Sequence, residues 1–304
     1  MRRLYLTCLC FLIVLNGFAQ TRAHWEQVVH WDGVSDWSRY MITLPGYQGP
    51  NSLPVPSIAN GSIDSTTYLS LAGDLHFSKG DNTQNPILYG NLCLVKDLIS
   101  FDMMFVPCEH YDMTPAMKDK RHVYSKFYND NSAVGDVHLS TRFQIFNKWR
   151  KHIQLALRIG YRFPSGNGFG AARYSDGPGY FFDASFGKPF RNTKWKWTGM
   201  AGFYVWQIES DVFNQDDAFM FGTGLEYADK GWLVKGGFAG YLGYIYHSGD
   251  KPMVLRASVE KRIKNASYFT SLQRGIHDFT YTSVEAGFRY FFRNTARRVV
   301  ISKE

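Results

Sequence analysis

Three residues with the chemistry of a catalytic triad, Asp136, His138 and Ser140, lie close together in the sequence. An acid, an imidazole and a hydroxyl can together activate a nucleophile. Same-face neighbours in a strand are about 6.6–6.8 Å apart, whereas a nucleophile and its base need about 2.6–3.2 Å between heavy atoms. The apolar alternation of Val137 and Leu139 also turns the three side chains away from the apolar face. A lipid hydrolase therefore stays only as the weaker alternative.

A second polar group, Glu109, His110 and Asp112, offers oxygen and imidazole ligands for a divalent cation. A polar cluster at the start of a loop is far commoner than a metal site. The glycine-rich residues 165–170 lack the lysine and hydroxyl of a phosphate-binding loop. No HExxH, CxxC or GxSxG pattern occurs, so the sequence predicts neither a cofactor nor a metal.

The first nineteen residues have the pattern of a secretory signal peptide. Arg2 and Arg3 precede an apolar run over residues 4–15, and the small residues Gly17 and Ala19 suit a cleavage site after residue 19. A run of this length is too short for a stable membrane-spanning helix. The net charge of +8 would allow nucleic acid as a partner, but export makes that partner unexpected.

Two cysteines remain after residue 19, Cys93 and Cys108. Their spacing matches no zinc pattern. One disulfide is possible in an oxidising compartment, and two unrelated cysteines are an equally good interpretation.

From residue 65 onward, apolar residues recur at every second position over about ten residues before each polar break, which is the period of a β-strand. Residues 152–163 show this most clearly. We expect about twelve strands, within a range of about 10–14. The predicted segments are 65–78, 87–96, 98–110, 134–146, 152–163, 179–188, 195–209, 217–228, 232–246, 253–263, 266–273 and 281–292.

The two faces of these strands distinguish a membrane barrel from a soluble sandwich. One face is large and apolar, and the other is rich in glycine, small and polar residues. This is the pattern of a transmembrane barrel with lipid outside and a polar lumen inside. Short connections also alternate with longer ones, as periplasmic turns alternate with external loops. The prediction is an all-β fold, a transmembrane antiparallel up-and-down β-barrel over residues 65–292.

Charged residues of both signs fall on the predicted inner face in balanced numbers. A structural network of ion pairs and a polar lining that selects solutes are both open interpretations. Inward-facing glycines (Gly160, Gly187, Gly222, Gly237, Gly243 and Gly287) leave room for a plug or a ligand. The lumen-lining candidates are Asp74, Asp102, Asp136, His138, Arg142, Arg158, Arg162, Asp183, Glu226, Lys235, Arg256, Glu260, Arg262, Glu285 and Arg289.

The last segment has aromatic residues at alternate positions, Phe288, Tyr290 and Phe292. It resembles the C-terminal signal by which outer-membrane proteins are inserted, although a basic tail, residues 293–304, follows. Residues 105–114 and 133–140 are similar to stretches of the outer-membrane barrel family named for phenol meta-pathway degradation, a set of candidate transporters. Residues 18–20 resemble signal endings common in Bacteroidota. The resemblance implies a Gram-negative outer-membrane transporter.

Residues 20–64 do not alternate, and a proline-rich stretch covers residues 49–56. We interpret this segment as a periplasmic extension or as a plug that enters the barrel; a solvated arm is also open. The predicted function is a channel or transporter for small solutes, including amphipathic ones. The alternative is a non-conducting structural or interaction barrel with binding loops 111–133 and 164–178. Expected partners are outer-membrane lipid and lipopolysaccharide, the outer-membrane assembly machinery and a small-molecule solute, with no nucleic acid.

Overall fold

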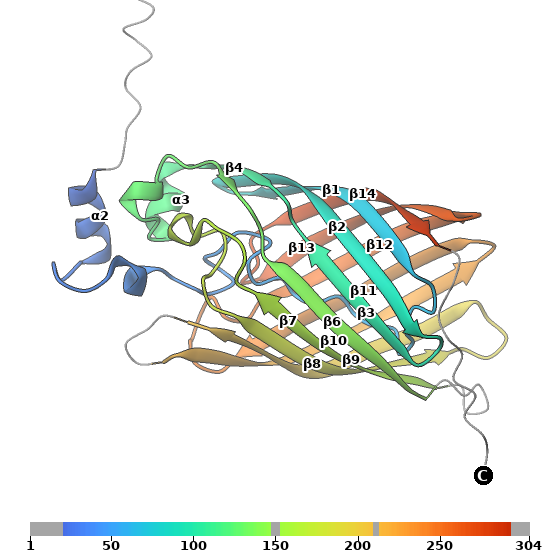
Figure 1. Cartoon of the computed structure of the whole chain (residues 1–304). Coiled ribbons are helices and arrows are strands. Elements are labelled where there is room, and N and C mark those ends of the chain that lie inside the picture. The colour runs from blue at the N-terminus through green and yellow to red at the C-terminus, as the bar shows by residue number, and fades with distance from the viewer. Residues whose placement is uncertain (1–20, 147–152, 209–212, 293–304) are drawn as a thin grey trace, which may run out of the picture.

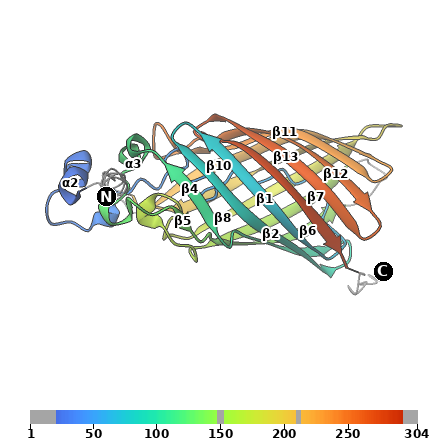
Figure 2. The same cartoon turned by 90° about the horizontal axis from the view of Figure 1, so that it is seen from above.

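The computed structural model describes residues 21–146, 153–208 and 213–292. The predicted signal peptide and the basic tail lie outside the described residues. Twelve antiparallel strands form a closed barrel in which the first strand pairs with both the last and the second. Figures 1 and 2 show the strands tilted around the barrel axis. Closure pairs every strand on both sides, so no sheet edge is left inside the wall.

Every predicted segment overlaps one strand of the barrel wall. The strands of the wall are β1 (Tyr68–Ser78), β2 (Asp81–Val95), β3 (Ile99–Phe105), β6 (Val137–Phe146), β7 (Gln154–Phe163), β8 (Gly179–Pro189), β9 (Trp195–Gln207), β10 (Gln215–Asp229), β11 (Trp232–Gly243), β12 (Met253–Ile263), β13 (Ala266–His277) and β14 (Thr282–Phe291).

Several predicted boundaries were wrong by a few residues. Residues 81–86 belong to β2, although their polar character indicated a loop. The third segment ends at Phe105, and Glu109–Met113 forms a separate strand, β4. β4 pairs with the start of β2 and with the two-residue strand β5 (Ser132–Ala133). Polar residues extend these strands because the sheet there projects beyond the part of the wall that meets lipid.

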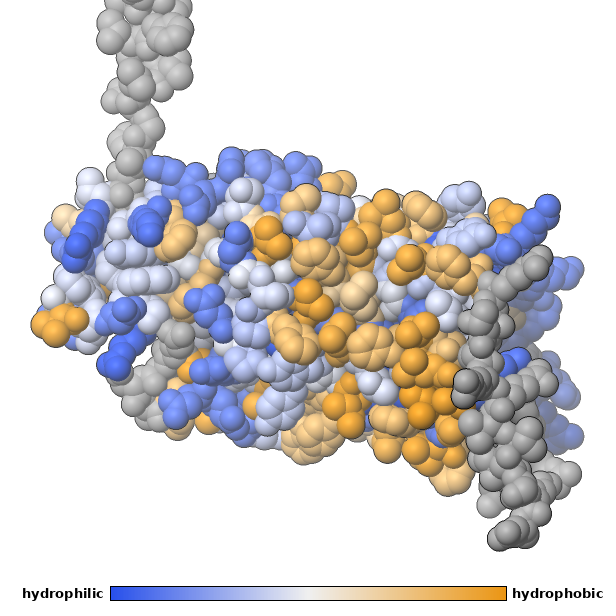
Figure 3. Space-filling model, in the orientation of Figure 1, coloured by the Kyte–Doolittle hydropathy of each residue, from blue (hydrophilic) through white to orange (hydrophobic). Residues whose placement is uncertain are grey.

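The outer surface of the barrel is a belt of large apolar side chains. Leu71, Phe182 and Leu255 are each exposed to 43–49%, whereas their sequence neighbours point inward. The belt is visible as the apolar band across the barrel wall in Figure 3. Exposing so many large apolar residues to water would be unfavourable. The belt therefore marks the surface that meets lipid, as the alternation predicted.

The two ends of the barrel differ. One end, the turn end, has short connections such as residues 230–231 and 264–265. The other, the loop end, carries long loops over residues 106–136 and 164–178, with the helices α3 (Pro115–Lys120), η2 (Ser125–Phe127) and η4 (Phe169–Ala171). By the convention of bacterial barrels, the turn end faces the periplasm and the loop end faces outward.

The N-terminal part of the described chain forms a cap at the loop end (residues 21–40), with helix α2 (Arg22–Val29) and the short helix η1 (Trp37–Tyr40). Trp25 is buried and donates a hydrogen bond to the carbonyl of His122 over 3.1 Å. Trp37 stacks on Tyr124 with the ring centroids 4.7 Å apart. These aromatic contacts fix the cap on loop 106–136.

No helix among the described residues is long and apolar enough to cross a membrane. Cys93 is buried in β2, and Cys108 is exposed before β4. The two are not joined to each other, so the possible disulfide between them does not form in this structure.

Candidate functional site: a plugged lumen

Residues 41–66, which we call the plug, run through the barrel from the loop end to the turn end. Figure 1 shows this segment passing inside the wall before β1 begins. Pro54 and Pro56 favour an extended backbone. The plug has 26 residues, so even with the turns between residues 44 and 53 it is long enough to cross a hydrocarbon core of about 30 Å. Of the three interpretations of residues 20–64, namely a periplasmic extension, a plug or a solvated arm, the plug describes the path of residues 41–66, whereas residues 21–40 form the cap at the loop end.

The middle of the plug is held by two arginines of the wall. The guanidinium of Arg256 donates to the carbonyls of Val55 and Pro56, over 2.5 and 3.0 Å. Arg158 donates to the carbonyl of Ser57 over 3.0 Å. An extended chain inside a barrel has no strand partner, so its carbonyls need donors from side chains. The arginines predicted to line the lumen provide them.

Nearer the turn end, the plug is held by polar contacts. Asn60 donates to the carboxylate of Glu226 over 3.0 Å. Gln144 accepts from the backbone N–H of Ile63 at 3.0 Å and donates to the carbonyl of Gly61 at 2.9 Å. Each of these groups would otherwise be a buried polar atom without a partner, which is costly.

Two glycines let this part of the plug touch the wall. A Cβ added at Gly187 would lie 2.2 Å from the carbonyl oxygen of Asn60, and one at Gly61 would lie 2.3 Å from the backbone N of Gly187. Gly61 also has a φ of +76°, which favours glycine. A Cβ at Gly222 or Gly237 would meet the side chain of Ile58 at 2.9 or 2.7 Å. Three of the six inward glycines of the sequence therefore face the plug.

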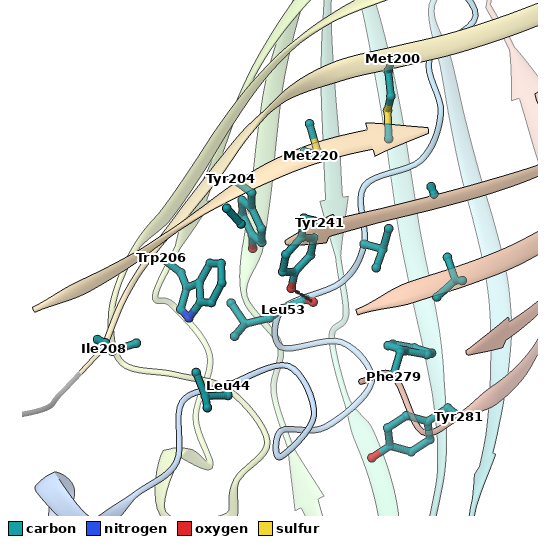
Figure 4. Close-up of a cluster of buried hydrophobic side chains, with 14 residues drawn as sticks. Leu44, Leu53, Met200, Tyr204, Trp206, Ile208, Met220, Tyr241, Phe279 and Tyr281 are labelled. Carbon is teal, nitrogen blue, oxygen red and sulfur yellow. Dashed lines mark hydrogen bonds between the residues drawn. The ribbon is translucent and has the colours of Figure 1, made fainter. Parts of the chain in front are cut away.

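Nearer the loop end, the plug packs into an apolar cluster on the inner wall (Figure 4). Leu44 and Leu53 lie against Trp206 and Tyr241, all 6% exposed or less. Tyr241 donates to the carbonyl of Leu53 over 2.8 Å, and the indole of Trp206 donates to the carbonyl of Thr43 over 3.0 Å. The aromatic residues thus cover the apolar side chains of the plug and also donate hydrogen bonds to its backbone carbonyls.

A network of buried charges fixes the loops above the plug. Asp81 accepts from Arg121 at 2.6 Å and from Arg173 at 2.7 Å, and Arg173 also binds Glu109 at 2.6 Å. All four side chains are at most 1% exposed. Asn51 of the plug donates to Glu109 over 2.7 Å. Two carboxylates and two guanidinium groups compensate each other, as burial of charge requires.

The remaining lumen candidates form ion pairs or hydrogen bonds along the wall. Asp183 pairs with Arg158, Asp136 with Arg162, Asp102 with Arg142 and Glu260 with Arg289. Glu226 binds Lys196 at 3.0 Å and Lys235 at 3.8 Å, and Glu285 accepts from Tyr89. Asp74 lies opposite Glu285 in register. Arg262 lies over the ring of Phe291 at the turn end.

The alternative catalytic and metal candidates are not assembled into sites. Ser140 donates to Asp102, and Asp136 is bound to Arg162 and the backbone N–H of Gly166. His138 faces Arg162 in register, and no hydrogen bond joins it to Ser140 among the described residues. Glu109 points inward, whereas His110 and Asp112 lie on the exposed face of β4. Strand alternation separates these ligands, so the sequence-based metal candidate does not form.

Most of the residues that hold the loop end were not predicted from the sequence. Asp81, Arg121 and Arg173 lie outside the predicted strands, in stretches that look like ordinary polar loops. Gln144, Trp206 and Tyr241 were placed on strands but carry no charge that would have singled them out. The glycine and proline pattern of residues 46–61 was the one available signal of close packing.

An opening remains at the loop end beside the plug. A cavity of about 280 Å³ is lined by Arg39, Tyr40, Met41, Ile42, Thr43, Leu44, His122, Ile208 and Tyr246. Its walls come from the cap, the plug, loop 106–136 and the ends of strands. Five of its nine lining residues carry polar side chains, namely Arg39, Tyr40, Thr43, His122 and Tyr246.

Comparison with known proteins agrees with the fold. No family model and no curated protein matches the sequence. The COG4313 outer-membrane channel from Pseudomonas putida F1 is similar in structure, with a TM-score of 0.56 at 10% identity over 79% of this chain and 99% of that one. The CymD monoaromatic hydrocarbon channel has a TM-score of 0.41 at 8% identity, over 76% of this chain and 90% of that one, too low to carry an argument. The fold and its lipid-facing belt define an outer-membrane β-barrel.

Proposed function

We propose that this protein is a gated outer-membrane channel or transporter for small solutes, including amphipathic ones, and that the plug is its gate. The observation that carries the proposal is a plug that is held inside a twelve-stranded barrel by noncovalent contacts. A barrel of this size lies between one filled by its own side chains and an open pore. The plug is hydrogen-bonded to the wall and not part of it, so it can move without breaking the barrel.

Two further observations support this proposal. The P. putida protein, which has a similar fold, is an outer-membrane channel. Residues 105–114 and 133–140 resemble the phenol meta-pathway family of candidate transporters, and we propose membership of that family in a Gram-negative bacterium of the Bacteroidota type. We further propose that the chain is not an enzyme, because Ser140 and His138 are held apart on one strand.

A reversible cross-link tests the gate. Ile58→Cys and Gly222→Cys, in residues 20–304 with Cys93 and Cys108 changed to serine, would place two thiols beside each other, because a Cβ at residue 222 lies 2.9 Å from Ile58. We expect conductance steps in a planar bilayer that disappear on oxidation and return on reduction. The two single-cysteine variants should not respond to oxidant.

The alternative, a structural barrel with binding loops 111–133 and 164–178, predicts a different result. Such a barrel would show no steps with either the wild type or the variant Arg158→Gln with Arg256→Gln, which loosens the plug. The channel proposal would be overturned if neither protein showed conductance steps while both migrated as folded barrels on unheated gels.

A further inference from the structure

The turn end carries a group of basic side chains that the channel proposal does not use. We call these residues the basic rim: Lys96, Lys188, Arg191, Lys194, Lys230, Lys261 and Lys264. Carboxylates are fewer beside them, namely Asp64, Asp97 and Asp229, and Asp64 lies 3.8 Å from Arg142. Asp229 is paired with Lys194 over 2.7 Å, and Asp97 accepts a hydrogen bond from Ser65 over 2.5 Å. The described part of this end therefore has a marked excess of positive charge.

The loop end does not share this excess. Lys118, Lys120 and Lys126 on loop 106–136 lie in the same loop as Asp112, Asp119 and Asp130. The positive charge is thus concentrated at one end of the barrel. A patch of positive charge next to a low-dielectric surface concentrates anions.

The basic rim is continuous with the lipid-facing belt. Lys188 points outward beside Trp197, its partner in register, and Lys261 lies beside Trp232 and Tyr268. The Nζ atom of Lys261 is 4.6 Å from the centre of the Trp232 ring. Trp197, Trp232 and Tyr268 are each more than 40% exposed. Tryptophan and tyrosine mark the depth of lipid headgroups, so the lysines lie at the level of the phosphates.

The turns add further charge at the same level. Lys230 and Lys264 occupy left-handed turn positions with φ of 46° and 54°. Their side chains are exposed. Figure 3 shows hydrophilic side chains beyond the apolar band at this end of the molecule.

We propose that the basic rim binds the headgroups of anionic phospholipids in the periplasmic leaflet of the outer membrane. The geometry fits this partner because the charges lie on the outside of the barrel just beyond the apolar belt, at the depth of lipid headgroups. Several lysines acting together attract an anionic leaflet, and salt weakens this attraction. The inference is independent of whether the barrel conducts.

Lipid quenching of the rim tryptophans tests the proposal. Residues 20–304 with Trp149→Phe are refolded into vesicles that mix phosphatidylcholine with phosphatidylglycerol, one of the two brominated. Trp195, Trp197 and Trp232 are exposed on the outer wall at the turn end, whereas Trp25 and Trp206 are buried. Contact with a brominated lipid quenches the fluorescence of the exposed tryptophans. The extent of quenching therefore reports which lipid surrounds the basic rim.

We expect phosphatidylglycerol to be preferred by about threefold or more at low salt, because several charges contribute. The ratio of the preference for phosphatidylglycerol over phosphatidylcholine should fall towards one in 0.5 M salt. It should also fall towards one in the triple variant Lys188→Gln, Lys230→Asn, Lys264→Asn. Asparagine keeps the left-handed turn positions. The matched control, Lys118→Gln, Lys120→Gln, Lys126→Gln at the loop end, should keep the full preference.

Equal quenching by both lipids in folded wild-type protein would overturn the proposal. An equal loss of preference in the loop-end control would also overturn it, because the charge would then act through the whole molecule. Binding of a soluble acidic polymer without any lipid preference would assign the rim to a periplasmic partner instead. Conductance is measured on the same samples, so that a failure of the lipid proposal can be distinguished from a failure of the channel proposal.

Discussion

The two parts of the plug are held in different ways. The loop-end part, residues 41–55, is anchored by buried aromatic side chains and lies beneath the network of Asp81, Glu109, Arg121 and Arg173. The turn-end part, residues 56–66, makes mainly hydrogen bonds and glycine contacts. Burial and paired charges are costly to undo, whereas a hydrogen bond exchanged for water costs little. In a gated channel we therefore expect the turn-end part to be the one that moves.

The largest expected effect is on the accessibility of the cap and of the plug to a reagent outside the cell. Val34 in the cap is 90% exposed. In a background with Cys93 and Cys108 changed to serine, Val34→Cys should be fully labelled on intact cells by a maleimide that does not cross membranes. Ile58→Cys inside the lumen should not be labelled until the cells are lysed and the protein is unfolded. Labelling of Ile58→Cys but not Val34→Cys would contradict the path of the plug.

The next largest effect is on the buried charge network. Arg173→Gln leaves Asp81 and Glu109 buried with one guanidinium fewer, which should lower the free energy of unfolding by about 3–5 kcal/mol. Urea unfolding of the refolded barrel, followed by tryptophan fluorescence, measures this. Lys126→Gln, an exposed lysine nearby, should change it by less than about 0.5 kcal/mol. Equal effects of both would argue against the network as an anchor.

The apolar anchor should come next. Leu53→Ala removes a side chain that is 2% exposed and packed against Tyr241, and we expect a loss of about 2–5 kcal/mol with a cavity left behind. Val34→Ala at the exposed tip is the control and should be nearly neutral. If Leu53→Ala is also neutral by urea unfolding, the loop-end part does not anchor the plug.

At the turn end we expect a smaller effect on stability but a measurable effect on conductance. Gly187→Ala puts a methyl 2.2 Å from the carbonyl of Asn60, which should cost about 1–3 kcal/mol and displace the plug. The frequency of open steps in a bilayer should rise. Gly73→Ala, where a Cβ would meet nothing within 4 Å, is the matched control. Unchanged gating in Gly187→Ala would place the moving part elsewhere.

The smallest effect is local to the cap. Hydrogen bonds from the Ser35 side chain and from the backbone N–H groups of Val34 and Ser35 lower the pKa of Asp32 to about 2. Because the folded pKa is depressed, this contribution to the turn is present above about pH 4 and is lost as the pH falls through about 2. Amide chemical shifts of Val34 and Ser35 should show this midpoint. A midpoint near 4 would mean that the turn is not formed.

Much of the barrel could be predicted because its wall repeats one rule. Period-2 alternation fixes which side chains face lipid, and this predicted the strands and the inward position of Arg158 and Arg256. Boundaries failed where that rule no longer applied. Residues 81–86 extend β2 beyond the lipid, and there the pairing with β4 decides the conformation.

The sequence by itself determined the closed barrel, its lipid-facing belt and the glycines that make room inside it, because each follows from local alternation and composition. Only the tertiary structure decided the path of residues 41–66, the burial of Arg173 between Asp81 and Glu109, and the separation of His138 from Ser140. These depend on which distant segments meet inside a closed wall, where every buried carbonyl and charge must find a partner. No periodicity in a single chain encodes that choice of partners.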